Sequence, residues 1–117
     1  MRIATFNLEN LAEGPELDAR LALLRPQLLR LNADILCLQE VDAARRKKGE
    51  RRTLSALQRL LEHTPYQDFF LVSTTDPGTG APVDRHNLVV LSRWPVRNTT
   101  QVRNNLVAPP TLSLIHI

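Results

Sequence analysis

Hydrophobic and polar residues alternate from the first positions of the chain. Residues 2–8 place apolar side chains on one face of an extended segment and Asn7 on the other, which predicts a strand. Leucines then recur every three or four positions and predict one apolar face of a helix: Leu17, Leu21, Leu24, Leu28 and Leu31. Pro26 falls inside this pattern, so we expect the helix to kink there or to split near Arg25.

The next apolar segments predict a buried strand and a second helix. Residues 35–41 are almost continuously apolar up to Gln39 and Glu40, which indicates a strand covered on both faces. Thr53 is a candidate cap for a leucine-rich helix, and we expect that helix to end at His63.

Three short segments in the second half predict further strands: 69–72, 87–92 and 96–102. We expect the last of these to pair with 87–92 across the turn at 93–95. The order of strands and helices favours a mixed α/β (or α+β) sheet covered by helices. A sheet buried on both faces needs a second layer on its far face, and the pattern predicts only two helices, so we expect the chain to be part of a larger fold.

The composition is typical of one globular domain without disulfides or a zinc cluster. The chain has 117 residues and a net charge of +3, which suits an anionic partner such as nucleic acid or a phosphate ester. Its single cysteine, Cys37, lies in an apolar run and is expected to be a core residue. No apolar stretch reaches the roughly 18 residues that span a bilayer, and no signal-peptide pattern opens the chain. We therefore expect a cytoplasmic protein without a membrane span.

Two predicted strands carry polar groups near their ends. Asn7 lies in the first strand, and Glu40 closes the apolar strand 35–41. A carboxylate at the exit of a buried strand is costly unless it is paired or binds a metal, and sites in open sheets gather at strand ends. An amide oxygen with a carboxylate suits Mg²⁺. The alternative is that Glu40 caps a turn or pairs with an arginine of the basic segment 45–52.

Three segments resemble, in order, the strand motifs of the endonuclease/exonuclease/phosphatase family: residues 2–10, 33–41 and 87–96. The resemblance implies a four-layer α/β sandwich, with two mixed β-sheets flanked by helices, of which this chain is the N-terminal part. It also implies metal-dependent hydrolysis of a phosphoester, of nuclease or phosphatase type, with Mg²⁺ or Mn²⁺ as cofactor.

The same resemblance implies roles for individual residues. Asn7 takes the family's asparagine role and orients phosphate and metal, and Glu40 takes the metal-ligand role. Gln39 is similar to a neighbouring glutamine that supports the ligands. His86 and Asn87 stand where the family often has Gly-Asn, which leaves open whether His86 approaches the substrate.

The sequence also departs from the family pattern. The later motifs, which include a Gly-Asp-Phe-Asn stretch and a final Asp-His that carries the general base, do not occur. We therefore expect residues 1–111 to be a partial domain and the chain alone to be inactive. Residues 112–117 match the in-frame translation of a transposase adapter used in sequencing libraries, and we expect them to be a sequencing-adapter artefact.

Two alternatives to this enzyme stay open. A non-catalytic nucleic-acid-binding module could use the basic segment 45–52, although aromatic residues for base stacking are missing there. A degenerate family member could keep the sheet and lose the chemistry. The sequence does not distinguish DNA, RNA, sugar phosphate or lipid phosphodiester as substrate.

Overall fold

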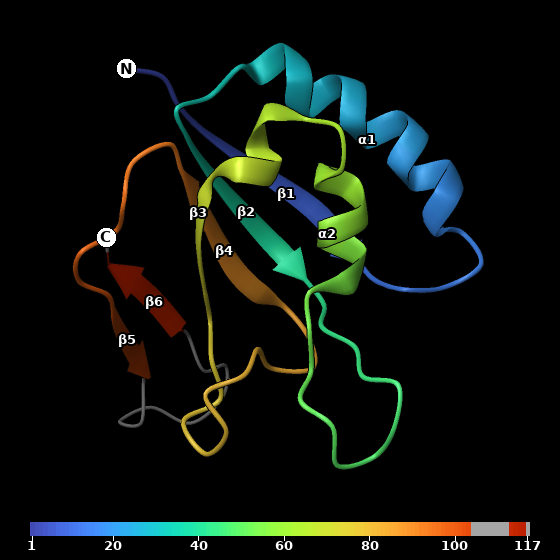
Figure 1. Cartoon of the computed structure of the whole chain (residues 1–117), viewed down its shortest axis with the longest axis vertical. Helices are drawn as coiled ribbons and strands as arrows, with labels where there is room; N and C mark the ends of the chain where they lie inside the picture. The colour runs from blue at the N-terminus through green and yellow to red at the C-terminus, as the bar shows by residue number, and fades with distance from the viewer. Residues whose placement is uncertain (104–112, 117) are drawn as a thin grey trace.

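The alternating residues at the start of the chain form the edge strand β1 (Ile3–Leu11) in the computed structural model, which describes residues 1–103 and 113–116 (Figure 1). Phe6 and Leu8 face the core, whereas Thr5 and Asn7 face outward. This division between the two faces confirms the alternation expected from the sequence.

Four strands form one mixed sheet in the order β1-β2-β4-β3. The central strand β2 (Ile35–Val41) runs parallel to β1, with Ile3 opposite Ile35. On its other side β2 pairs antiparallel with β4 (Asn87–Ser92), and β4 pairs antiparallel with β3 (Phe70–Ser73). The expected mixed α/β sheet is therefore present.

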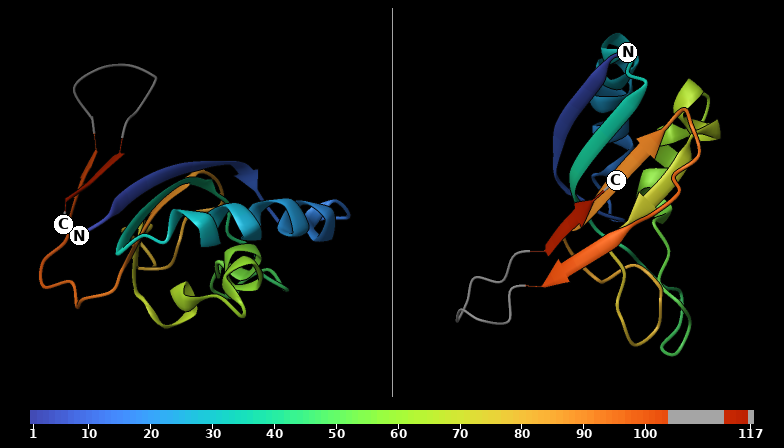
Figure 2. Two further views of the ribbon diagram at one scale, coloured as in Figure 1. Left: turned by 90° about the horizontal axis from the view of Figure 1, so that it is seen from above. Right: turned by 90° about the vertical axis from the view of Figure 1, so that its left-hand side faces the viewer.

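Two helices, α1 (Leu17–Leu31) and α2 (Ser55–Leu61), cover one face of this sheet, together with the 3₁₀ turn η1 (Pro65–Asp68) (Figure 2). The core lies between the helices and the sheet and is built mainly from leucines. Among its completely buried members are Leu8, Leu28, Leu36, Leu57 and Leu60.

Helix α1 buries the predicted leucine face, since Leu17, Leu21, Leu24 and Leu28 are all buried and Leu31 is partly buried. The helix runs unbroken through Pro26, so the alternative of a split near Arg25 is wrong. Pro26 lies on the exposed face, where the carbonyl that loses its N–H partner need not be buried. The helix ends at Leu31, and the left-handed backbone of the flanking Asn32 (φ 43°) suits the capping position.

The second helix begins and ends differently from the prediction. Its first flanking residue is Leu54, which makes no side-chain cap, while Thr53 pairs with Ala44 through backbone hydrogen bonds of 2.8 and 2.9 Å. The helix ends at Leu61, and His63 lies in the following turn with φ of 62°. Thr53 is not the cap because the helix begins at Ser55, which puts Leu54 rather than Thr53 in the capping position.

The strand pairing predicted for 96–102 is wrong. β5 (Thr100–Arg103) pairs antiparallel with β6 (Ser113–His116) in a separate two-stranded sheet. The reason is that β4 already has β2 on one side and β3 on the other. The proposed boundary between residues 111 and 112 falls outside the described residues, as do positions 112 and 117 of the expected adapter segment.

One face of the sheet stays largely open within the described residues. Along β2, Leu36 and Leu38 are buried against the helices, whereas Ile35 and Cys37 on the opposite face are only partly buried. The expected cover on both faces is therefore not provided by residues 1–103 and 113–116. Partial burial still raises the pKa of the Cys37 thiol.

The amino end of β2 is held by an ion pair. The Asp34 carboxylate accepts a hydrogen bond from the Arg2 backbone N–H at 2.7 Å and another from Arg93 Nε at 2.9 Å. These two donors, first the Arg2 amide and then the Arg93 guanidinium, hold the pKa of Asp34 below its usual value.

Candidate active site

The carboxyl ends of β1 and β2 meet at one edge of the sheet because the two strands are parallel. In their register Asn7 lies opposite Gln39, and Glu40 follows directly. The structure thus brings together the three residues that the sequence singled out. The loops that leave β2 and enter β4 gather at the same end of the sheet (Figure 1).

Both strands are irregular at this edge. The β1–β2 register shifts between Asn7 and Leu11, and the β2–β4 register shifts between Leu38 and Val41. We call Glu9–Asn10 the β1 bulge and Gln39–Glu40 the β2 bulge. Bulges of this kind re-aim side chains and are common beside active sites.

The β2 bulge keeps Glu40 out of the core. Strict alternation after the buried Leu36 and Leu38 would bury Glu40 next, but Val41 takes the core position instead. The Glu40 side chain is left 34% exposed. In β1 the same shift places Leu11, rather than Asn10, in the core.

The bulges place residues other than glycine in left-handed backbone conformations. Glu9, Asn10 and Glu40 have φ values of 49°, 63° and 59°. Such conformations cost about 1–3 kcal/mol each and concentrate at functional sites. Their concentration at this edge therefore favours a functional role.

Asn7 is exposed, and its side chain is oriented by the β1 bulge. Its Oδ1 accepts a hydrogen bond from the Glu9 backbone N–H at 2.7 Å. Its side-chain direction therefore depends on the conformation of the residues that follow it.

Gln39 connects the two parallel strands on the open face. Its Nε2 donates to Thr5 Oγ1 at 2.9 Å and to the Cys37 carbonyl at 3.1 Å. The bond to Thr5 ties the β2 bulge to β1, and the bond to Cys37 stays within β2. Gln39 thus stabilises the strands rather than Glu40 itself. Among the described residues, no hydrogen bond joins the Gln39 side chain to Glu40.

Glu40 lies beside His86, whose Nδ1 is 3.9 Å from Glu40 Oε1. The His86 backbone N–H donates to Asp42 Oδ1 at 3.0 Å, and the residue has φ of 61°. No described residue donates a hydrogen bond to the Glu40 carboxylate. The alternative that Glu40 pairs with an arginine of the basic segment is therefore not seen: the paired arginines there bind other groups.

Asn87 is the residue whose role the sequence did not reveal. It is completely buried, and its Nδ2 donates to the Val41 and Val83 carbonyls at 2.8 Å each. Its Oδ1 accepts from the Val83 N–H at 3.0 Å. Asn87 thereby fixes the loop that carries His86 against the end of β2. A polar residue at the start of an apolar strand was the available signal.

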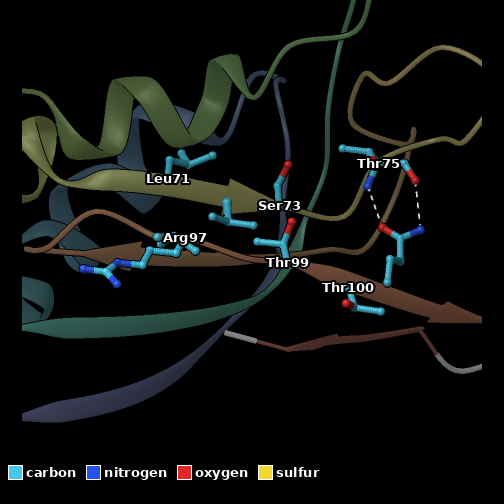
Figure 3. A pocket seen from close by; sticks show the side chains of 9 residues that line it. Leu71, Ser73, Thr75, Arg97, Thr99 and Thr100 are labelled. Carbon is cyan, nitrogen blue, oxygen red and sulfur yellow. Dashed lines mark hydrogen bonds between the residues drawn. The ribbon is translucent and has the colours of Figure 1, made fainter.

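A hollow of about 440 Å³ between β3 and residues 96–101 lies apart from this edge (Figure 3). Gln101 spans it with paired hydrogen bonds of 2.9 Å to the Thr75 backbone N–H and carbonyl. Arg97 is the one charged residue among those that line it. Because no carboxylate or histidine is among the lining residues in the described part of the chain, we place no chemistry there.

A comparison with protein families identifies the family of this chain. The model of the endonuclease/exonuclease/phosphatase family matches residues 4–113. The chain belongs to this family. Membership indicates hydrolysis of phosphoesters in general. No curated protein and no solved structure matched the chain.

At this end of the sheet, the side chains offer the kind of donor atoms that Mg²⁺ prefers. The described ranges contain no group of three or more histidine, cysteine, aspartate or glutamate side chains that could hold a metal. Glu40 and Asn7 nevertheless offer hard oxygen donors. Mg²⁺ commonly takes one or two protein carboxylates and completes its coordination with water and phosphate.

Within residues 1–103 and 113–116, no helix is both long and apolar enough to cross a membrane.

Proposed function

We propose that this chain supplies the metal-binding part of the active site of a Mg²⁺- or Mn²⁺-dependent phosphoesterase. Asn7 and Glu40 are the protein ligands, and Gln39 holds the two strands that carry them. The observation that supports this most is the β2 bulge, which turns Glu40 away from the core and leaves its carboxylate without a hydrogen-bond donor among the described residues.

Each residue then has a defined task. Bound metal would stabilise negative charge on a phosphoryl oxygen and assist in generating hydroxide. Glu40 supplies the negative charge that retains the cation. The Asn7 Oδ1 accepts the Glu9 N–H with one lone pair, which leaves the other lone pair for the metal. The NH₂ group of the same amide can then donate to a phosphate oxygen.

The general base belongs, in this proposal, to the later motifs of the family, which the sequence lacks. The open face of the sheet, with Ile3 64% exposed, is where a second sheet would pack in a four-layer sandwich. We therefore expect the 117 residues alone to be inactive, and we propose hydrolysis for the enzyme that the complete reading frame encodes.

The basic segment 45–52 supports a nucleic-acid substrate over a small phosphate ester. It follows β2 after residues 42–44, at the end of the strand that carries Glu40. Arg51 donates to the Thr79 carbonyl at 3.0 Å and Arg52 pairs with Asp84 at 3.2 Å, which anchors one end of the segment. Residues 45–48 are four consecutive exposed cations that form no ion pair with any described residue.

Cations in this arrangement suit a phosphate backbone rather than one phosphate group. Arg45 lines a hollow of about 700 Å³ beside α2 and another of about 230 Å³ beside the loop before β4. A polyanion could follow these two hollows along the same end of the sheet. The same feature also favours the second candidate, a module that binds nucleic acid without cleaving it.

Metal binding tests the main proposal without relying on turnover. Mn²⁺ should broaden the NMR signals of Asn7 and Glu40 in ¹⁵N-labelled protein, and Glu40→Gln should abolish this effect. Equal broadening in Glu40→Gln, or none in the wild type, would reject the assigned metal site.

A DNA-binding titration at several salt concentrations tests the substrate class. Replacing residues 45–48 with glutamine should weaken binding and reduce the salt slope, whereas Arg30→Gln at the end of α1 should change both less. DNA binding without Mg²⁺-dependent cleavage by the complete enzyme would favour the non-catalytic module or a degenerate family member.

A further inference from the structure

Arg20 is a half-buried arginine of α1 that reaches the end of β1. Its guanidinium donates to the Leu8 carbonyl and, at 3.3 Å, to the Asn10 carbonyl. It forms no ion pair with any residue in the described ranges. An arginine that faces carbonyl oxygens rather than a carboxylate holds backbone in place.

The two carbonyls flank Glu9, which is the residue that orients Asn7. The Glu9 N–H donates to Asn7 Oδ1, and both Glu9 and Asn10 are left-handed. The planar guanidinium has several donors in a fixed arrangement, so one side chain can bridge two oxygens. Arg20 thus clamps the strained bulge on both sides of the N–H that Asn7 uses.

The surroundings of Arg20 place it between two hollows. One, of about 290 Å³, is also lined by Asn7 and Glu9, and the other, of about 400 Å³, is lined by Glu9 and Asn10. Glu9 and Asn10 themselves are exposed, whereas Leu8 and Leu11 on either side of them are buried in the core. The hydrogen bonds of Arg20 join the backbone carbonyls beside Glu9 to the helix.

We propose that Arg20 is a positioning residue for the active site: it fixes the β1 bulge and, through the Glu9 N–H, the direction of the Asn7 amide. This inference rests on the proposed function for its effect on metal binding. The positioning itself is a property of the protein without metal.

Arg25 provides a matched control on the same helix. It is also half-buried, and it also donates to two carbonyls, those of Arg59 at 2.8 Å and Leu60 at 3.2 Å. These lie at the end of α2 rather than in the β1 bulge. Arg20→Met and Arg25→Met remove equivalent bonds from different places.

The experiment compares these variants by NMR in the absence of metal and then by Mn²⁺ titration. Without metal, Arg20→Met should shift the Asn7 side-chain amide signal and speed hydrogen exchange at the Glu9 amide, whereas Arg25→Met should change neither. With Mn²⁺, Arg20→Met should weaken binding about 10–100-fold, the usual effect of losing a residue that orients a ligand. Arg25→Met should bind Mn²⁺ as the wild type does.

The outcomes separate the two proposals. Unchanged Asn7 and Glu9 signals in Arg20→Met would overturn the positioning role whether or not metal binds. If these signals change but the wild type binds no Mn²⁺, the metal site is wrong and the positioning role stands. Should Arg20→Met fail to fold, Arg20→Lys serves instead, because one ammonium cannot reproduce the planar bridge between the two carbonyls.

Discussion

Strand β2 carries a carboxylate at each end, and the two have opposite environments. Asp34, just before the strand, accepts hydrogen bonds from the Arg2 N–H and from Arg93. Glu40, near its end, has no donor among the described residues, has a left-handed backbone and lies 3.9 Å from a histidine. One strand thus has a stabilised end and an end where conformational strain is retained.

The two carboxylates at the ends of β2 therefore differ in kind: Asp34 stabilises the fold, whereas Glu40 stays available to a ligand. A carboxylate with two good donors lowers the free energy of the folded state. A carboxylate held in a strained bulge without a donor gains nothing for stability and leaves its oxygens available to a ligand. The following predictions test whether the two ends differ in this way.

The largest expected effect is on catalysis at the Glu40 end. In the complete enzyme, Glu40→Gln should lower Mg²⁺-dependent phosphodiester hydrolysis by about 10²–10³-fold or more, because it removes charge stabilisation of the transition state. Asn7→Ala should have nearly the same effect. The measurement is kcat at saturating Mg²⁺. Asp34→Asn is the control and should retain turnover. Wild-type rates in Glu40→Gln would mean that Glu40 has no catalytic role and that the two ends of β2 do not differ in function.

The next largest effect is on the stability of the core between helix α1 and the sheet. Leu24→Ala should lower the free energy of unfolding by roughly 2–5 kcal/mol, because Leu24 is 8% exposed and packs in the core. Leu23→Ala on the same helix is the control: Leu23 is 69% exposed, and its loss should stay within about 0.5 kcal/mol. Urea denaturation measures both. Similar values for the two variants would mean that the orientation assigned to α1 is wrong.

A smaller effect is expected from exchanging the charges for amides. Asp34→Asn should lower the urea midpoint at neutral pH because the charged partner of Arg93 is lost. Glu40→Gln should leave the midpoint unchanged or raise it, since Glu40 has no such donor. A greater loss of stability in Glu40→Gln than in Asp34→Asn would reverse the comparison.

The pKa of Asp34 gives the smallest effect, on the pH dependence of stability. Its folded pKa lies below the reference value of 3.8. The stabilising contribution is therefore fully present above about pH 5 and is lost as the pH falls through the lowered pKa. Urea midpoints measured on both sides of pH 4 should show a shallower acid slope in Asp34→Asn. An identical slope would show that other carboxylates control this region.

The sequence predicted the strands that carry Asn7 and Glu40 but not how their ends bend. Alternation and apolar runs report local faces, so they located β1, β2 and the leucine face of α1. The bulges are irregularities in the pairing of β1 with β2 and of β2 with β4, and no local pattern contains this pairing. The same limit explains the wrong pairing of 96–102, because an adjacent segment cannot join a strand whose edges are both taken.

The sequence could not reveal some contacts of the site, because the side chains involved bind backbone groups of other segments. Arg20 is one of several arginines on a helix, and nothing in its neighbours shows that it faces carbonyls of β1. Asn87 gave a weak signal, a polar side chain at the start of an apolar strand, but its partners are 4 and 46 residues away in sequence. The site roles of Asn7, Gln39 and Glu40 stay predictions until metal binding is measured.

Cys37 lies on the open face of the sheet, opposite Thr5 on β1 and Val90 on β4. It is the only thiol in the sequence, so every event of alkylation reports on this one position. Because only the thiolate reacts and partial burial raises its pKa, labelling should accelerate with pH above the range of an ordinary cysteine. A layer packed on this face would stop the labelling. The rate of alkylation in this chain, compared with that in the complete enzyme, therefore provides a chemical footprint of whatever covers the sheet.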